Sequence, residues 1–294
     1  MQQRLERTVR KPVTATGVGF LTGADVTVRF LPAPAGHGIA FRRVDCPGAR
    51  PIPALIEFAL PRERRTALGR DGVVVEMTEH VLAALAGLQI DNCLVELDAP
   101  ELPGGDGSSL HYTEALLDAG FEEQDRLRES IAVEHPLRVE AADGKSELAG
   151  RPLGRPSLAI TYQLDYGPRS PIPAQNLTVE ITPENFLREL AFARTFLLEA
   201  EAEALRQQGY GSRTTFGDLL VFGPDGVVGN SLRAADECVR HKILDCVGDF
   251  ALLGADLRGH ITAYRSGHHL NRELVQRLRQ SQNLPRAGSA GRVA

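Results

Sequence analysis

The last quarter of the chain contains the stretch Arg240-His241-Lys242-Ile243-Leu244-Asp245, which opens a predicted helix over residues 234–253. Gly254 follows this run and is typical of a helix end. His241 and Asp245 are four residues apart, so both side chains lie on one face of the helix, one turn apart. An imidazole and a carboxylate placed in this way can bind one divalent metal ion, but a metal site needs further ligands.

The same spacing has a simpler explanation, because many His–Asp pairs on helices form only a surface hydrogen bond or ion pair. The apolar residues nearby, however, predict a helix that is largely buried: Ile243, Leu244, Val247, Phe250, Leu252 and Leu253. A buried His beside a buried Asp needs a partner, since an unpaired buried charge is costly. From the spacing alone, a metal ligand pair and a simple ion pair both stay open.

The composition of the 294 residues is that of a soluble globular protein, with 43% hydrophobic and 24% charged residues. A net charge of -5 gives no electrostatic footprint for nucleic acid. No run approaches the roughly 18 apolar residues of a membrane span, and the first residues lack the apolar core of a secretory signal. The four cysteines, Cys46, Cys93, Cys238 and Cys246, form no CxxC pair, and we expect them to be reduced in the cytoplasm.

A second helix that begins with a histidine is predicted in the first half of the chain. Thr78 suits the N-cap, the run Leu82–Leu85 favours a helix, and Gly87 suits the position just after its end. Glu79 and His80 therefore belong to the first turn. Because strands, helix, strand and helix occur twice in this order, we predict an α+β fold of two similar halves. The two His-bearing helix starts could meet at a shared face.

The charge-dense segment 121–130 is expected to connect these halves. We expect an N-terminal domain over residues 1–125, with a small insert at about 45–70, and a C-terminal domain over 126–282. Residues 283–294 are expected to form a disordered tail.

Two histidines and one carboxylate are a recurrent ligand set for catalytic zinc, and this set leaves a fourth position for water. The cysteines are spaced wrongly for a structural zinc site. Glu79, beside the candidate ligand His80, is placed to act as a general base. An acid in the first turn of a helix is also common for a structural reason, its interaction with the helix dipole. His268 and His269 follow Ser266-Gly267 in a predicted loop, and His269 is expected to point elsewhere.

Six motifs occur in one order between about residue 10 and residue 280. They are Thr16-Gly17-Val18-Gly19, Thr78-Glu79-His80 with Ala83-Ala84-Leu85-Ala86-Gly87 and Ile90-Asp91-Asn92, Asp106-Gly107-Ser108, Ala193-Arg194-Thr195-Phe196, Val239-Arg240-His241-Lys242-Ile243-Leu244-Asp245-Cys246-Val247-Gly248-Asp249, and Ser266-Gly267-His268-His269-Leu270-Asn271. This series resembles the UDP-3-O-acyl-N-acetylglucosamine deacetylase family, zinc amidases that commit bacteria to lipid A synthesis. The resemblance covers nearly the whole chain.

The resemblance implies hydrolysis of the substrate's N-acetyl group to give a free amine and acetate. It implies three zinc ligands: His80, His241 and Asp245. Glu79 would be the base that deprotonates the attacking water. His268 would stabilise the oxyanion and protonate the leaving amine, and Asp249 would orient His268. Thr195 would offer its hydroxyl to the oxyanion.

The resemblance further implies contacts to the substrate from Lys242, Arg265, Tyr166 and Phe196. Lys242, inside the motif but off the ligand face, and Arg265 would face the diphosphate of UDP, and Tyr166 aligns with an aromatic residue that contacts uracil.

The family fold consists of two α+β domains, each a mainly antiparallel sheet with two helices. The helices lie sandwiched between the two sheets, as in domain 2 of ribosomal protein S5. Each domain carries a small insert, the second at about 197–229. The implied cofactor is Zn2+, although Fe2+ also suits this ligand set. The implied partner is a UDP-linked acylated amino sugar, bound by a cytoplasmic monomer with no nucleic acid partner and no stable membrane insertion.

The chain departs from the family pattern where the substrate is expected. Phe20-Leu21 replace the usual Leu-His, Gly104-Gly105 replace Ile-Met, and Leu197-Leu198 replace Gly-Phe. The second insert, which in the family forms a hydrophobic passage for the acyl chain, is comparatively polar over Glu199–Phe216. We therefore expect an intact reaction centre with a remodelled substrate pocket.

Two other functions stay open. One is a zinc deacetylase of the same mechanism that acts on another N-acetylated sugar conjugate, with a shorter acyl chain or none. The other is a non-catalytic regulator that binds zinc or a nucleotide sugar. The presence of Glu79, His268 and Asp249 argues against the regulator, because a binding protein does not need them.

Overall fold

The computed structural model describes residues 4–281, so the tail expected at 283–294 lies outside the described residues. Within the described residues the chain forms a mixed α+β structure with six α-helices and several β-sheets. No helix in this part of the chain has the length and apolar composition that a membrane crossing requires. The α+β class expected from the sequence is confirmed.

The first half is built on a five-stranded sheet in the order β2-β3-β9-β4-β5. Its strands are β2 (Val13–Val18), β3 (Asp25–Pro32), β4 (Ile39–Arg43), β5 (Ile52–Pro53) and β9 (Cys93–Leu97). The strand β9 lies antiparallel to β3 and parallel to β4. In β3 the side chains of Val26, Val28 and Phe30 are buried while those between them are more exposed, the alternation of a sheet with one covered face.

The second half repeats this arrangement with the order β12-β13-β19-β14-β15. Its strands are β12 (Leu137–Glu140), β13 (Glu147–Arg151), β14 (Leu158–Leu164), β15 (Gln175–Glu180) and β19 (Asp256–Tyr264), and β11 (Ser130–Ala132) also pairs with β19. The last strand, β19, again lies between an antiparallel neighbour and a parallel one. The two halves therefore share one strand order and one set of directions, in agreement with the repeat read from the sequence.

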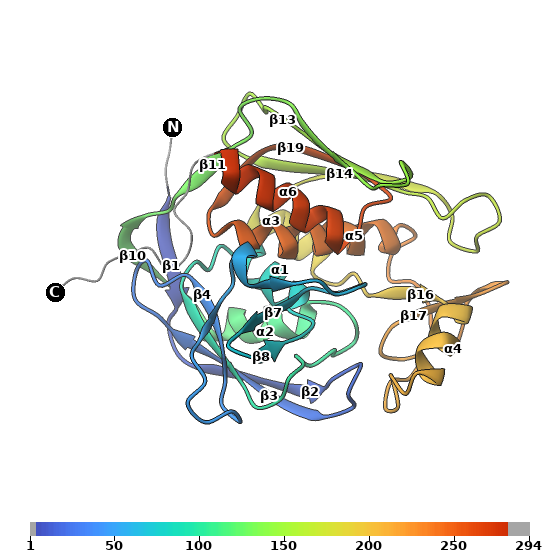
Figure 1. Cartoon of the computed structure of the whole chain (residues 1–294), viewed down its shortest axis with the longest axis horizontal. Helices are drawn as coiled ribbons and strands as arrows, with labels where there is room; N and C mark the ends of the chain where they lie inside the picture. The colour runs from blue at the N-terminus through green and yellow to red at the C-terminus, as the bar shows by residue number, and fades with distance from the viewer. Residues whose placement is uncertain (1–3, 282–294) are drawn as a thin grey trace.

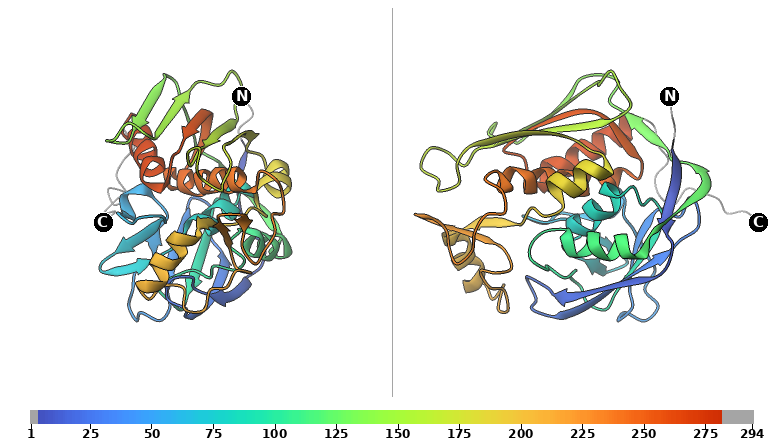
Figure 2. Two further views of the ribbon diagram at one scale, coloured as in Figure 1. Left: turned by 90° about the vertical axis from the view of Figure 1, so that its right-hand side faces the viewer. Right: turned by 180° about the vertical axis from the view of Figure 1, so that it is seen from behind.

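Helices fill the space between the two sheets (Figure 1), and the side and rear views show the same layers (Figure 2). In each half one helix precedes the central strand and one follows it. These helices are α1 (Glu79–Gly87) and α2 (Leu110–Ala119) in the first half, and α5 (Glu237–Phe250) and α6 (His268–Ser281) in the second. The short α3 (Pro183–Asn185) continues as a π-helical turn over Phe186–Leu190. The helices α1 and α5 pack directly against each other, which brings the two histidine-bearing elements together.

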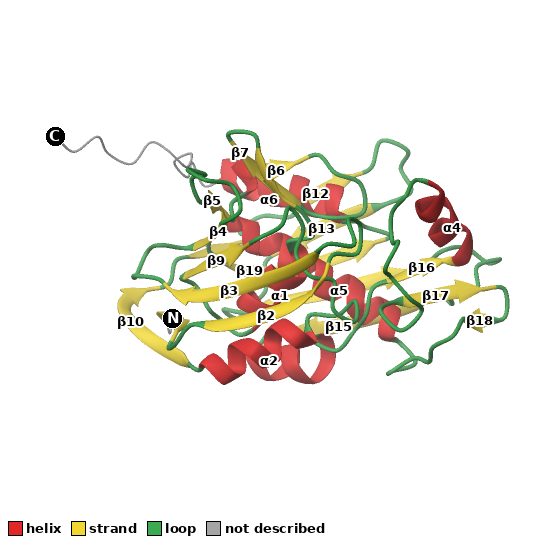
Figure 3. Cartoon of the chain, turned by 90° about the horizontal axis from the view of Figure 1, so that it is seen from below, coloured by secondary structure: helices red, strands yellow, loops and turns green. Residues whose placement is uncertain are grey.

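Two small substructures extend from this body. In the first half a 3-10 turn (Ile56–Phe58) leads into a three-stranded sheet of β6 (Ala59–Leu60), β7 (Ala67–Arg70) and β8 (Val73–Val75). This sheet overlaps the expected insert at about 45–70, whereas β5 at Ile52–Pro53 pairs with β4 in the main sheet. In the second half β16 (Phe196–Leu198), α4 (Glu199–Gln207), β17 (Leu220–Gly223) and β18 (Gly226–Val227) form the second insert, close to the expected 197–229. It projects from one end of the molecule (Figure 3).

The segment expected to connect the halves is itself a strand. β10 (Phe121–Leu127) pairs antiparallel with β1 (Leu5–Val9), so the expected boundary after residue 125 falls inside it. Most β10 side chains are exposed. The segment therefore lacks the alternation of apolar and polar residues by which a half-buried strand is recognised.

The helix predicted after Thr78 is confirmed, but the residues at its two ends act differently from the prediction. The hydroxyl of Thr78 donates to the carbonyl oxygen of Thr66, 3.2 Å away, and does not cap the helix. Gly87 belongs to the helix, and a Cβ there would lie 2.3 Å from the ring of Phe186. This glycine is thus explained by close packing against a neighbouring aromatic ring.

Candidate active site

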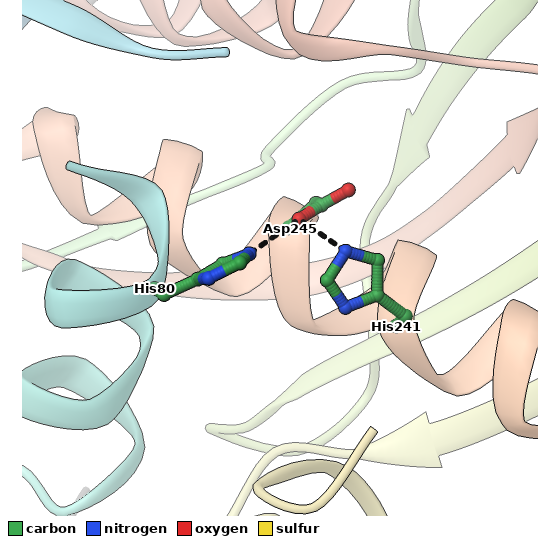
Figure 4. Close-up of side chains that lie close together, drawn as sticks. All are labelled: His80, His241 and Asp245. Carbon is green, nitrogen blue, oxygen red and sulfur yellow. Dashed lines mark ion pairs between the residues drawn. The ribbon is translucent and has the colours of Figure 1, made fainter. Parts of the chain in front are cut away.

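Three metal-binding side chains converge where α1 meets α5. His80 comes from the first turn of α1, and His241 and Asp245 come from one face of α5 (Figure 4). The Oδ1 atom of Asp245 lies 3.4 Å from Nε2 of His241 and 3.8 Å from Nε2 of His80. All three side chains are buried. The pair proposed from the four-residue spacing thus gains its third member from the other half of the chain.

The donor atoms of this group suit a single divalent ion. One ligand atom from each residue lies within 4.8 Å of the other two. Nδ1 of His241 lies 3.1 Å from the carbonyl oxygen of Ala193, so a proton on Nδ1 is donated there and the lone pair of Nε2 is left for a metal. Two imidazoles and one carboxylate form a ligand set that catalytic zinc uses, with room for a further ligand.

Burial and neighbouring charges favour the protonation states that metal binding requires. Burial, followed by the charge of His241, lowers the pKa of His80 to about 3. Burial also lowers the pKa of His241. For Asp245, burial acts to raise the pKa, but His241 and Lys242 outweigh it and hold the pKa well below its usual range. The group therefore offers neutral imidazoles and an ionised carboxylate, the forms that bind metal ions.

Glu79 precedes the ligand His80 and is also buried. Its Oε2 atom accepts a hydrogen bond from the backbone amide of Thr66 at 3.0 Å. Burial raises the pKa of Glu79 to about 7, although the charge of His268 acts in the opposite direction. A carboxylate with a pKa near neutrality is suited to take up and release a proton at physiological pH.

His268 and Asp249 form a buried pair next to the ligands. Nδ1 of His268 lies 2.8 Å from Oδ2 of Asp249, and Nε2 lies 3.9 Å from Oδ2 of Asp245. The ring thus turns one nitrogen to its carboxylate partner and the other toward the metal ligands. Burial acts to lower the pKa of His268, but the charge and hydrogen bond of Asp249 raise it to about 9. An imidazolium is therefore favoured at neutral pH.

Thr195 lies where the two halves meet. Its backbone amide and its hydroxyl both donate to the carbonyl oxygen of Gly107, at 2.7 Å and 3.0 Å. In this arrangement the hydroxyl proton is engaged with Gly107. Donation to an oxyanion would require the hydroxyl to turn away from that carbonyl.

The residues expected to contact the substrate lie in different surroundings. Position 242 is expected to lie off the ligand face, and Nζ of Lys242 nevertheless lies 2.7 Å from Oδ2 of Asp245. Residues three apart on a helix are neighbours, and a long side chain reaches across that distance. Arg265, at the end of β19, instead pairs with Asp165 at 2.7 Å.

Phe196 and Tyr166 continue outward from the metal ligands. The ring of Phe196 lies 6.0 Å from the ring of His241 and 6.0 Å from that of Tyr166, between centroids. Phe196 is buried, whereas Tyr166 is 44% exposed. Aromatic side chains thus lead from the ligand group to the surface.

The residues at positions 20, 104 and 105, which depart from the family pattern, lie where glycine backbone packs against aromatic rings. A Cβ at Gly104 would lie 2.3 Å from the ring of Phe20, and a Cβ at Gly105 would lie 2.5 Å from the ring of His111. Each ring fills space that a side chain on the facing glycine would need. Glu101 holds the loop after Phe20 by accepting hydrogen bonds from the amides of residues 21 and 22.

Two residues at the site were missed by sequence reasoning. Gly248 lies on α5 against the first turn of α1. An isolated glycine within an otherwise strong helical pattern is the sequence feature that could have indicated this close helix contact. Thr66 contacts both Glu79 and Asp249. It carried no signal, because it is a single threonine in an arginine-rich segment and its partners are distant in the sequence.

Comparisons with known proteins cover nearly the whole chain. The family model described as UDP-3-O-acyl N-acetylglycosamine deacetylase (LpxC) matches residues 6–280. A protein of Myxococcus xanthus named UDP-3-O-acyl-N-acetylglucosamine deacetylase is 38% identical over 279 residues, which are 93% of this chain and 86% of that protein. A protein of the same name from Solibacter usitatus is 37% identical over 276 residues, 94% of this chain and 91% of that protein.

The match includes both halves and therefore every element that supplies the buried group of His80, His241 and Asp245. It also includes Glu79, His268 and Asp249, which surround that group. The chain belongs to the UDP-3-O-acyl-N-acetylglucosamine deacetylase family of hydrolases.

Proposed function

We propose that this chain hydrolyses the N-acetyl group of UDP-3-O-acyl-N-acetylglucosamine, releasing acetate and leaving the free amine, as a step of lipid A biosynthesis. Family membership supports the reaction and the substrate. The observation that carries the proposal is the buried group of His80, His241 and Asp245, with a carboxylate and an imidazolium held beside it. A metal ligand set with one base and one acid is what amide hydrolysis requires.

Zinc is the ion we assign to this group, with Fe2+ as the alternative that suits the same donors. A bound divalent ion supplies Lewis acidity, which polarises a carbonyl group and activates water. His80, His241 and Asp245 would hold it through two Nε2 atoms and a carboxylate oxygen. The hydrogen bond from Nδ1 of His241 to Ala193 supports this, because it fixes the ring with Nε2 toward the site.

Glu79 is assigned as the general base. As the oxygen of the attacking water bonds to the acetamide carbon, the carboxylate of Glu79 takes one proton from that water. Its raised pKa of about 7 makes it a stronger base than an exposed glutamate while leaving much of it ionised near neutrality. The amide of Thr66 fixes one of its oxygens, which limits the directions in which the other can point.

His268 is assigned as the general acid. It carries a proton on Nε2, the nitrogen that faces the metal ligands, while Nδ1 donates to Asp249. As the carbon–nitrogen bond breaks, the sugar nitrogen takes the Nε2 proton and leaves as the amine. The acetyl group, with the oxygen of water, leaves as acetate. Before that step, the positive charge of His268 stabilises the oxyanion, a role that Thr195 would share if its hydroxyl turned from Gly107.

Four residues are proposed to bind the rest of the substrate. Lys242 and Arg265 are assigned to the diphosphate, and Tyr166 is assigned to the uracil. The burial of Phe196 against His241 supports a contact with the part of the substrate near the acetamide. Lys242 forms an ion pair with Asp245, and Arg265 forms one with Asp165. When a diphosphate binds, each cationic group would either leave its carboxylate partner or contact the carboxylate and the diphosphate together.

The second insert supports an altered acyl preference. A hollow of about 320 Å³ lies at the end of α4, and it is lined by Arg206, Gly209, Tyr210, Gly211, Ser212 and Thr214. Apart from the aromatic ring of Tyr210, these side chains are polar or small, whereas a long acyl chain is best buried against apolar ones. We therefore propose a shorter acyl chain than an apolar passage would hold. The alternative is a zinc deacetylase of the same mechanism that acts on another N-acetylated sugar conjugate, with a shorter acyl chain or none.

At the level of the fold, we propose two domains over residues 1–125 and 126–282, related to domain 2 of ribosomal protein S5. The shared strand order of the two main sheets supports this division. The cytoplasmic location and the monomeric state expected from the sequence stay predictions.

The substrate class is tested by a series of UDP-3-O-acyl-N-acetylglucosamines that differ only in acyl length. Acetate release by zinc-loaded protein is measured for each. We expect release with every member that fits and the highest kcat/KM for a short chain. The highest kcat/KM for the longest chain would contradict the altered preference. No release with any member would contradict the proposed substrate.

A further inference from the structure

The amide, the hydroxyl and the carbonyl group of Thr66 each form a hydrogen bond at the candidate site. It lies between β6 and β7 of the first insert and is fully buried. Its amide donates to Oε2 of Glu79 at 3.0 Å, and its hydroxyl donates to Oδ1 of Asp249. Its carbonyl oxygen accepts hydrogen bonds from the amide and hydroxyl of Thr78, the residue before α1. A single residue thus contacts the carboxylates of both Glu79 and Asp249.

The carboxylates of Glu79 and Asp249 belong to different halves of the chain and are assigned to different steps of the reaction. Glu79 stands at the start of α1, and Asp249 stands on α5. Oδ2 of Asp249 accepts hydrogen bonds from Nδ1 of His268 and Nδ2 of Asn271, both at 2.8 Å, while Oδ1 accepts from Thr66. With both oxygens engaged, the carboxylate plane of Asp249 is fixed. The direction in which it holds the ring of His268 is fixed with it.

The backbone around Thr66 is itself held in place. The carbonyl oxygen of Arg65 accepts a hydrogen bond from Arg272 of α6 at 3.2 Å. The side chain of Arg65 donates to Glu76 at 2.7 Å. Arg272 is itself buried. The peptide that carries Thr66 is therefore anchored from the second half as well as from the first.

We propose that Thr66 is a positioning residue for the hydrolysis, which orients Glu79 through its amide and the Asp249–His268 pair through its hydroxyl. This inference rests on the proposed function. Thr66 does not have to touch the substrate for this role. Groups that hold catalytic residues or metal ligands in place typically contribute about 10- to 100-fold to activity, and a displacement of about 1 Å can cost about 100-fold.

The test compares Thr66→Val, which keeps the shape but removes the hydroxyl, with Thr66→Ser, which keeps the hydroxyl. We expect kcat of Thr66→Val to fall about 10- to 100-fold with KM and bound metal unchanged. Thr66→Ser should recover most of that loss. Thr113→Val is the matched control, because Thr113 of α2 is equally buried and its hydroxyl donates to Ser109 at 2.9 Å. It should be destabilised to a similar degree while keeping kcat.

A double-mutant cycle separates positioning from a general structural effect. If the hydroxyl acts through Asp249, adding Thr66→Val to Asp249→Asn should cause little further loss of kcat. In protein with ¹⁵N-labelled histidine, the Nδ1 proton signal of His268 should shift in Thr66→Val and stay in place in Thr66→Ser. This NMR measurement does not depend on turnover.

If the wild type releases acetate and Thr66→Val is equally active, the positioning role of Thr66 is overturned while the proposed function is not. Fully additive losses in the cycle with an unshifted His268 signal would also overturn it. A wild-type protein that released no acetate would overturn the proposed function and, with it, the inference.

Discussion

Gly248 of α5 lies directly against the backbone carbonyl of Glu79 in α1, and a Cβ at position 248 would be only 2.1 Å from that oxygen. The close approach places α1 at the depth where His80 reaches the ligands on α5. Gly248 itself lies between Asp245 and Asp249 in the sequence of α5. The geometry of the site therefore depends on a residue that has no side chain.

Replacing Gly248 with alanine should disrupt both packing and metal binding. The new methyl group meets backbone, which cannot rotate away, so the helices must separate. We expect a loss of stability of about 1–3 kcal/mol, the usual cost of forcing extra volume into a packed interior, and weaker metal binding. Denaturant unfolding and metal titration measure the two effects. Gly154→Ala is the control, since a Cβ there would meet nothing within 4 Å. Unchanged metal affinity in Gly248→Ala would contradict this account of the helix contact.

The rate should depend on pH through one base and one acid. Glu79, with a pKa of about 7, must be ionised, and His268, with a pKa of about 9, must be protonated. The rate therefore rises with pH as Glu79 loses its proton and falls at higher pH as His268 loses its own. A bound cation favours deprotonation, so both midpoints should lie at or below these values. A kcat/KM profile from about pH 5 to about pH 10 measures them. A flat profile would exclude both assignments.

Phe20 and Gly104 should be energetically coupled. In Gly104→Ala the added methyl group meets the ring of Phe20 at 2.3 Å, which should destabilise the protein. In the presence of Phe20→Ala the same change should cost less, because the space is then free. We expect a coupling free energy of about 0.5–3 kcal/mol from the four unfolding free energies of this cycle. Additive effects would show that the two residues do not share this space.

Metal removal should lower stability as well as activity. The ligands come from α1 and α5, so an ion bound to all three residues binds the folded chain and not the unfolded one. A ligand at about 100 times its dissociation constant contributes about 2.7 kcal/mol by mass action. Treatment with a chelator should therefore lower the melting temperature, and added zinc should restore it. In His80→Ala, zinc should no longer raise the melting temperature; a rise equal to that of the wild type would place the ion elsewhere.

Much of the fold and the ligand group followed from local patterns. His241 and Asp245 were placed on one face by helical spacing, and His80 was placed in a first turn by the helix signals around it. The repeat of strands and helices predicted that these two elements would meet. These inferences succeeded because they depend on short-range periodicity, which the backbone geometry of a helix fixes.

The features that were missed depend on contacts between distant segments. β10 was not recognised because its exposed charges show no apolar face, and its partner β1 is more than a hundred residues away in sequence. The ion pair of Lys242 with Asp245 was not expected; a partly buried ammonium group is stabilised by a charged partner. Thr66 owes its position to Glu79, Asp249 and the anchored backbone of Arg65. None of these contacts leaves a periodic trace in the sequence.

The central claim is that Glu79 serves as the base of a metal-dependent deacetylation. The most direct measurement is acetate release from UDP-3-O-acyl-N-acetylglucosamine by wild-type protein and by Glu79→Gln, with the bound metal quantified in the same samples. We predict one metal ion per chain in both proteins. We also predict acetate release by the wild type and a loss of about 100- to 10,000-fold in Glu79→Gln, the range that general base catalysis contributes. Equal rates in the two proteins, or no release by metal-loaded wild type, would contradict the account.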